Sequence, residues 1–238
     1  MGRVPHIYWL TQHLGDVPRH NQWLSPSERV VLSGLTIVKR RAEWRLGRWT
    51  AKLALQKLVR SLSTGCHADI EVRAADSGAP AVFIDDKPLA VSISISHSRG
   101  VGLCAVCHGR FEVGCDAELI EPRSDAFLSD YLSKKEHKAI GRAAPADRAL
   151  MATLTWSAKE SVLKALRQGL RRDTRTIVVD MGAGDRRDGW TSLTAACVDT
   201  GQTFDGWWRR ANGHVYTVAS TNAGCSQKLL ASFQRPSS

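Results

Sequence analysis

The segment of residues 113–119, VGCDAEL, alternates so that two acidic side chains share one face of a predicted strand. Asp116 and Glu118 lie on this face beside Gly114, and apolar side chains form the other face. Two neighbouring carboxylates repel each other unless a positive group lies between them. A hard cation such as Mg2+, held by both carboxylates and by substrate phosphates, would explain the pair. A solvated sheet face with two ordinary acids explains it equally well.

A third acidic residue lies on a predicted helix. Trp156, Glu160 and Lys164 are spaced by four residues and therefore form one stripe along that helix. Glu160 is a candidate third carboxylate of the same site, with Lys164 as a cation one turn further on. The alternative is an ordinary exposed Glu–Lys pair, which contributes about 0.2–0.5 kcal/mol to helix stability.

Hydroxyl and imidazole groups gather near a predicted turn. Ser92, Ser94 and Ser96 share one face of a strand, and the sequence His97-Ser98-Arg99-Gly100 is typical of a turn. Such groups beside a glycine suit a bound phosphate. A polar turn without a ligand is the alternative.

The net charge of the chain is strongly positive. Its 238 residues include 33 Lys and Arg against 23 Asp and Glu, so the formal net charge is +10. This charge attracts nucleic acids, acidic proteins or small molecules that carry phosphate, and composition does not choose among them. Four basic residues share one face of the first long helix, either as a docking surface for an anionic substrate or as a solvated face: Arg41, Arg45, Arg48 and Lys52.

An internal repeat organises these elements. Capping boxes begin at Ser25 and at Ser133, which lie 108 residues apart. The helical segments 49–57, WTAKLALQK, and 156–164, WSAKESVLK, match at an offset of 107, and so do Ile70 and Ile177 in the strands that follow. Leu53 stands in the first copy where Glu160 stands in the second. This asymmetry is expected if a single site lies between the two copies.

We therefore expect an α+β fold made of two similar, pseudo-symmetric halves, residues 1–108 and 109–238. Each half has a long helix packed on a small, mainly antiparallel sheet, because helices and strands occur in blocks. We expect the active site between the halves, with the metal carboxylates in the second.

Hydrophobic residues make up 43% of the chain, which is typical of a globular protein. No stretch is long and apolar enough to span a membrane, and no signal peptide is evident, so we expect a cytoplasmic protein. Six cysteines include Cys104 and Cys107, whose spacing fits a zinc site. Two buried strand cysteines are the favoured interpretation because no second pair of ligands follows.

Together these residues resemble a known family. Residues 114–118, GCDAE, resemble its G-x-D-x-E motif, and residues 156–164 resemble its W-[ST]-x-K-E-[AS]-x-x-K motif. Ser96-His97-Ser98 resembles its S-H-S turn and Gly78-Ala79-Pro80 its G-x-P loop. The family is the 4′-phosphopantetheinyl transferase superfamily, of the surfactin-synthetase-activating type. The resemblance covers roughly residues 30–180.

The resemblance implies an enzyme that moves the phosphopantetheine arm of coenzyme A onto a serine of a carrier protein and releases 3′,5′-ADP. It implies that Asp116, Glu118 and Glu160 hold Mg2+, with Mn2+ as a substitute, on the pyrophosphate. Lys164 would stabilise the leaving phosphate. Glu160, acting through a water on the metal, is our first choice for the group that takes the serine proton, and Glu136 is the second, although Glu136 also fits a capping box.

The same resemblance implies a set of contacts to coenzyme A: Arg41, Arg48, Lys52, Gly78, Ala79, Pro80, Ser96, His97, Lys159 and Lys164. Three positions depart from the family pattern. Cys115 and Ala117 replace branched aliphatic residues, and Ala79 replaces a common basic residue, which weakens the case for a side-chain contact there.

The implied partner is an acidic acyl or peptidyl carrier protein of a fatty-acid, polyketide or peptide synthase, and we expect a monomer. The alternative is a basic nucleic-acid-binding protein, which would explain the charge. It would leave the three carboxylates unexplained, and the sequence has no recognisable nucleic-acid-binding motif. We therefore expect no nucleic-acid or membrane partner.

Overall fold

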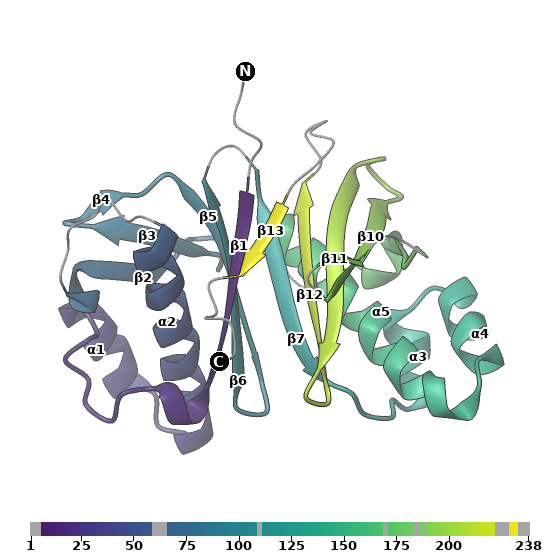
Figure 1. Cartoon of the computed structure of the whole chain (residues 1–238), viewed down its shortest axis with the longest axis horizontal. Helices are drawn as coiled ribbons and strands as arrows, with labels where there is room; N and C mark the ends of the chain where they lie inside the picture. The colour runs from purple at the N-terminus through teal and green to yellow at the C-terminus, as the bar shows by residue number, and fades with distance from the viewer. Residues whose placement is uncertain are drawn as a thin grey trace. The chain divides into compact units, whose positions relative to one another are not determined.

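The structure, a computed structural model, describes residues 6–58, 66–108, 111–168, 171–182, 186–187, 189–221 and 229–232. It has the expected α+β fold with mainly antiparallel sheets (Figure 1). Contacts divide the chain into two units, Met1–Phe111 with Gly224–Ser238, and Glu112–Ala223. Gly109, where the predicted second half begins, lies outside the described residues. The C-terminal strand Leu229–Ser232 groups with unit 1 because it pairs with the first strand of the chain.

Unit 1 contains two sheets. The larger has the order β13-β1-β6-β5, in which only the β1–β13 pair is parallel. The smaller has the order β2-β3-β4 and is antiparallel. The strands are β1 (His6–His13), β2 (Ile70–Ala74), β3 (Pro80–Ile84), β4 (Lys87–Pro88), β5 (Val91–Ser98), β6 (Val101–His108) and β13 (Leu229–Ser232).

Two helices complete unit 1. Helix α1 (Pro26–Gly34) begins at the predicted capping box, in which the Ser25 side chain accepts a hydrogen bond from the Glu28 amide and Glu28 accepts one from the Ser25 amide. Helix α2 (Val38–Leu58) packs on β1, β5 and β6, and its residues Ala51, Ala54 and Leu55 enter the core.

Unit 2 has one antiparallel sheet of order β7-β12-β11-β10-β8, with β9 pairing with β10. Three helices accompany the sheet, and α4 begins at the predicted capping box of Ser133 and Glu136. The elements are β7 (Val113–Leu119), α3 (Asp125–Tyr131), α4 (Lys134–Arg142), α5 (Pro145–Ala165), β8 (Ile177–Asp180), β9 (Arg186–Arg187), β10 (Trp190–Cys197), β11 (Thr203–Ala211) and β12 (His214–Thr221).

The repeat predicted from the sequence is therefore present in the fold. Each unit has a short capped helix, then a 21-residue helix on a mainly antiparallel sheet, then a strand. Helix α5 packs on β7 and β12 as α2 packs on β6 and β1. Among the described residues, no helix is long and apolar enough to cross a membrane.

Gly114 brings α5 unusually close to β7. A Cβ atom at this position would lie 1.8 Å from the Ser161 carbonyl oxygen and 2.6 Å from the Ala165 amide nitrogen. Both are backbone atoms of α5, so no side-chain rotation relieves the overlap. The missing side chain therefore sets how closely α5 approaches the strand that carries Asp116 and Glu118.

Gly114→Ala should destabilise the protein because α5 must move away from β7. We expect a loss of about 1–3 kcal/mol or more in the free energy of unfolding, the range for overpacked interiors. Gly141→Ala is the control: it lies in α4, a Cβ there meets nothing within 4 Å, and alanine favours a helix by up to about 1 kcal/mol. Urea denaturation of both variants measures this. Equal stability of the two would refute the close-packing role.

Candidate active site

Helix α5 faces the acidic side of β7 in unit 2. The alternation predicted for 113–119 is present: Val113, Cys115 and Ala117 are buried at 2% exposure or less. Asp116 lies on the other face and is only 4% exposed. The structure thus rejects a solvated sheet face for Asp116.

Glu160 of α5 belongs to the same electrostatic group as the β7 acids. Its Oε1 atom is buried without a hydrogen-bond partner in the described part of the chain. Burial raises the pKa of Glu160, the Lys164 ammonium opposes this, and the charges of Asp116 and Glu118 raise the pKa further. An exposed Glu–Lys pair is therefore also rejected for Glu160.

Lys164 lies one turn beyond Glu160 and reaches β7. Its ammonium group donates to Asp116 Oδ1 at 2.7 Å and to the Cys115 carbonyl oxygen at 3.1 Å. Burial lowers the pKa of Lys164, but the Asp116 carboxylate outweighs burial and the net shift is upward. Lys164 is thus a fixed cation that binds Asp116 and also acts on Glu160.

Two further residues hold Glu118. The Arg123 guanidinium lies 3.2 Å from Glu118 Oε2, and the Trp156 indole N–H donates to Glu118 Oε1 at 3.4 Å. Burial, followed by repulsion from Asp116, raises the pKa of Glu118 in spite of these contacts. The sequence indicated Trp156 through its stripe with Glu160. It offered no signal for Arg123, which lies in a loop without a recognisable motif.

The residues present fit a divalent cation by their chemistry. The charges of Asp116 and Glu118 act on Glu160, whose Oε1 atom is buried without a partner in the described part of the chain, and hard cations prefer oxygen ligands of this kind. However, no group of three or more His, Cys, Asp and Glu side chains in the described ranges is already arranged to hold a metal ion. Lys164 and Arg123 contact two of the three acids.

In unit 1, His97 packs against helix α2. A Cβ atom on Gly47 would lie 3.8 Å from His97 Cδ2, so the imidazole lies beside the helical turn that contains Arg48. His97 is exposed, and the Arg48 side chain is 17% exposed. Arg48 stacks on Trp44, with its guanidinium carbon 4.9 Å from the ring centroid. Burial lowers the pKa of Arg48, although Glu28 opposes the shift.

The turn predicted at His97-Ser98-Arg99-Gly100 is shorter in the structure. Strand β5 continues through Ser98, and the turn itself is Arg99-Gly100, both with positive φ. Ser96 is 8% exposed and is thus nearly buried in the strand. Gly78, with φ of 83°, forms the turn between β2 and β3, and Pro80 begins β3.

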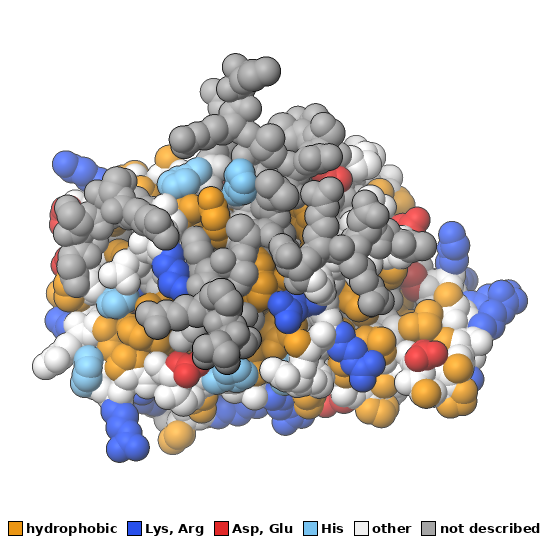
Figure 2. All heavy atoms as spheres, viewed as in Figure 1, with side chains coloured by type: hydrophobic (Ala, Val, Ile, Leu, Met, Phe, Trp, Pro, Cys, Tyr) orange, Lys and Arg blue, Asp and Glu red, His pale blue; other side chains and the backbone are white. Residues whose placement is uncertain are grey.

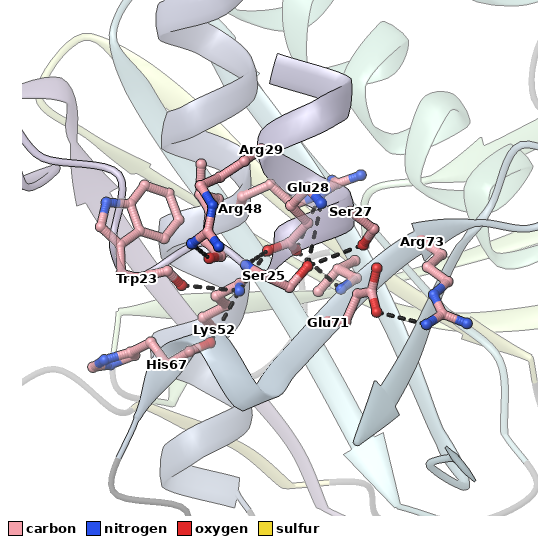
Figure 3. A network of polar contacts seen from close by, with 12 residues as sticks. Trp23, Ser25, Ser27, Glu28, Arg29, Arg48, Lys52, His67, Glu71 and Arg73 are labelled. Atoms are coloured by element: carbon pink, nitrogen blue, oxygen red, sulfur yellow. Dashed lines mark hydrogen bonds and ion pairs between the residues drawn. The ribbon is translucent and has the colours of Figure 1, made fainter. Parts of the chain in front are cut away.

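Lys52 is fully buried within unit 1 (Figure 3). Its ammonium group lies 2.5 Å from Glu28 Oε2. It also donates to the carbonyl oxygens of Trp23 and His67, at 3.0 and 2.9 Å. Glu28 Oε1 in turn accepts a hydrogen bond from the Val72 amide at 3.1 Å. The group therefore ties α2 to the cap of α1 and to the start of β2.

Unit 2 repeats this arrangement at the offset of the sequence repeat. Lys159 is fully buried, and its ammonium group lies 2.7 Å from Glu136 Oε2. It also donates to the Thr174 carbonyl oxygen at 3.0 Å. Thr174 Oγ1 donates to the Tyr131 carbonyl oxygen at 2.6 Å, which ties the end of α3 to the same group.

These buried pairs correct two of the expected coenzyme A contacts. Lys52 and Lys159 have no exposed side-chain surface, so neither reaches a ligand that approaches from solvent. Burial lowers the pKa of both lysines despite their carboxylate partners. Glu136 is held by Lys159 and by the Ser133 amide and hydroxyl, and lies in the α4 cap rather than among the three carboxylates.

Two arginines of the basic face predicted for the first long helix donate hydrogen bonds to backbone carbonyl oxygens. Arg41 donates to the carbonyl oxygens of Leu32 and Leu35 at 2.8 and 2.9 Å, which caps the end of α1. Arg45 donates to the Pro18 carbonyl oxygen. Much of this face therefore stabilises unit 1 and is not free to bind a substrate. Cys104 and Cys107 are buried, free thiols on β6.

One segment of the chain matches a known protein family. Residues 112–210 match the family model ACPS, the 4′-phosphopantetheinyl transferase superfamily. A holo-(acyl-carrier-protein) synthase from Bacillus anthracis, solved in complex with CoA (3′,5′-ADP), is 28% identical. The match covers 43% of this chain and 93% of that one, with a TM-score of 0.36. The Thermotoga maritima holo-[acyl-carrier-protein] synthase is 19% identical over 52% and 72% of the two chains, with a TM-score of 0.36. No curated protein matches the sequence.

The family match covers β7 and α5, so it contains all three carboxylates, Trp156 and Lys164. These are the residues on which the two sequence motifs rest. The segment of residues 112–210 thus matches the model of the 4′-phosphopantetheinyl transferase superfamily, the family that the motifs resemble.

Proposed function

We propose that the chain transfers the 4′-phosphopantetheine arm of coenzyme A to a serine of an acyl or peptidyl carrier protein and releases 3′,5′-ADP. One observation carries the proposal: Asp116, Glu118 and Glu160 form one interacting group of carboxylates, in which Lys164 binds Asp116, inside the segment that matches the transferase family. The carriers in question are those of fatty-acid, polyketide or peptide synthases.

The reaction makes one phosphorus–oxygen bond and breaks another. The serine oxygen attacks the pantetheine-bearing phosphorus of the pyrophosphate, and the bond to the phosphate of 3′,5′-ADP breaks. Asp116, Glu118 and Glu160 would hold Mg2+ or Mn2+, which would neutralise charge on the pyrophosphate oxygens.

Lys164 and Glu160 have distinct parts in this proposal. Lys164 is a permanent cation beside Asp116, and it donates to the phosphate that leaves. Glu160 is the proposed acceptor of the serine proton and would take it through an intervening water as the serine oxygen attacks.

Unit 1 supplies coenzyme A contacts in this proposal. Arg48 and His97 are the favoured phosphate-binding groups because both keep some exposed surface beside the Gly47 turn of α2. Ser96 and the loop Gly78-Ala79-Pro80 remain secondary candidates. The alternative of a nucleic-acid-binding protein loses support because Arg41 and Arg45 are engaged with backbone carbonyls.

The direct test incubates the protein with coenzyme A, Mg2+ and a panel of apo carrier proteins, and measures carrier mass. We expect the mass of the phosphopantetheine arm to appear on a carrier serine. EDTA should abolish the gain, and Mg2+ or Mn2+ should restore it. Absence of a gain on every carrier would refute the transferase, and a full gain in EDTA would refute the metal assignment.

Glu160→Gln should lower turnover by roughly 10²-fold or more, the scale for the loss of one charge-stabilising group. Leu53→Gln is the matched control, because Leu53 occupies the corresponding position in the repeat of unit 1 and packs against its core. That variant should lose stability but keep its turnover per folded molecule. Turnover corrected for the folded fraction distinguishes them, and equal losses would contradict a single carboxylate site.

A further inference from the structure

Helix α4 presents a strongly basic outer face. Lys134, Lys135, Lys138 and Arg142 are all exposed. Residues 134, 138 and 142 follow one another at steps of four, so they form a stripe, and residue 135 lies beside it. Within the described part of the chain, none of these four side chains forms an ion pair. Figure 2 shows Lys and Arg side chains at the end of the molecule where Figure 1 shows α4.

The inner face of α4 is different. Ile140 is buried in a small core with Leu128, Leu132 and Ala152. Glu136, the acidic residue of α4, is bound to the buried Lys159 at 2.7 Å. Its negative charge is therefore directed inward and does not offset the four outer cations. The neighbouring helix α3 carries the exposed acids Asp125 and Asp130, so the basic surface is that of α4 alone.

Of these four cations, only Arg142, in the last turn of α4, is favoured by the helix dipole. Lys134 and Lys135 lie in the first turn, where the positive end of the helix dipole repels cations. Like charges four residues apart, as in the pairs 134/138 and 138/142, also destabilise a helix. Helix stability therefore does not account for the basic face, and an anionic partner would.

The surface is also fixed relative to the carboxylate group. The Glu136–Lys159 pair ties α4 to α5 at the residue next to Glu160, and Lys159 is fully buried. A protein bound to α4 is thereby held at a defined position relative to Glu160. A docking surface for a substrate that must present a reactive group to that site needs such a connection.

We propose that the outer face of α4, formed by Lys134, Lys135, Lys138 and Arg142, is the docking surface for the acidic carrier protein. This inference rests on the proposed transfer reaction. The partner is a protein with acidic side chains at the spacing of a helix face, which the four cations complement.

The test compares two variants that each reverse two exposed cations. Lys134→Glu with Lys135→Glu removes half of the α4 surface, and Lys39→Glu with Arg40→Glu makes the same change in net charge on exposed residues of unit 1. For a carrier that the wild-type protein modifies, kcat/KM should fall about ten-fold or more in the α4 variant. It should change less than two-fold in the control, and the KM for coenzyme A should be unchanged in both.

A stability measurement separates docking from misfolding. Glutamate in the first turn of α4 suits the helix dipole, so the Tm of the α4 variant should equal or exceed that of the wild-type protein. Equal falls of kcat/KM in both variants would show that only net charge matters and would overturn the inference. An unchanged kcat/KM in the α4 variant would also overturn it.

Direct binding distinguishes failure of the inference from failure of the proposed function. Titration of the same apo carriers, without coenzyme A, should show weaker binding by the α4 variant than by the wild-type protein. If the wild-type protein binds a carrier through α4 but does not modify it, the transfer reaction fails and the docking surface stands. If it neither binds nor modifies any carrier, the docking inference is refuted. The inference is also refuted if a short DNA duplex binds to α4 and the carriers do not.

Discussion

A buried carboxylate–ammonium pair organises each unit of this protein. Removing an ammonium group from water costs several kcal/mol, and only close partners offset that cost. Lys52 and Lys159 therefore require their surroundings to be in place: a capping-box glutamate from one side and a backbone carbonyl from a following turn. Because each pair joins three segments, it fixes the long helix relative to the capped helix and to the next strand.

The carboxylate group in unit 2 depends on this frame. Lys159 fixes α5 from one side, and Gly114 lets the same helix lie against β7 on the other. Between these two contacts, Glu160 and Lys164 are brought to the acidic face of β7. The Trp156 ring packs against Phe127 and Tyr131, and its N–H donates to Glu118. Carboxylates that repel one another are thus held together by packing and by the cations Lys164 and Arg123.

The sequence predicted features whose signals are local. Capping boxes, strand alternation and the repeat depend on neighbouring residues, and each is present in the structure. Lys52 and Lys159 were assigned to coenzyme A from the family resemblance, and no local pattern shows that they are buried, because their burial depends on partners 15 to 29 residues away. The parallel pairing of β1 with β13 joins the two ends of the chain, and no local pattern indicates it. Arg123 was missed for the same reason, since only the fold brings it to Glu118.

The two buried pairs differ in a way that separates scaffold from site. In unit 1 both Glu28 oxygens have partners, because Oε1 accepts from the Val72 amide. In the described part of unit 2, Glu136 Oε1 and Glu160 Oε1 are buried without hydrogen bonds. An unpaired buried oxygen lowers stability, so unit 2 retains unfavourable electrostatics that the fold itself does not require. In unit 1 the position that corresponds to Glu160 is occupied by Leu53, which has no polar oxygen to leave without a partner. The two copies thus differ at the carboxylates: the oxygens of Glu28 both have partners, whereas Glu136 Oε1 and Glu160 Oε1 do not. Buried polar groups without partners are expected at functional sites.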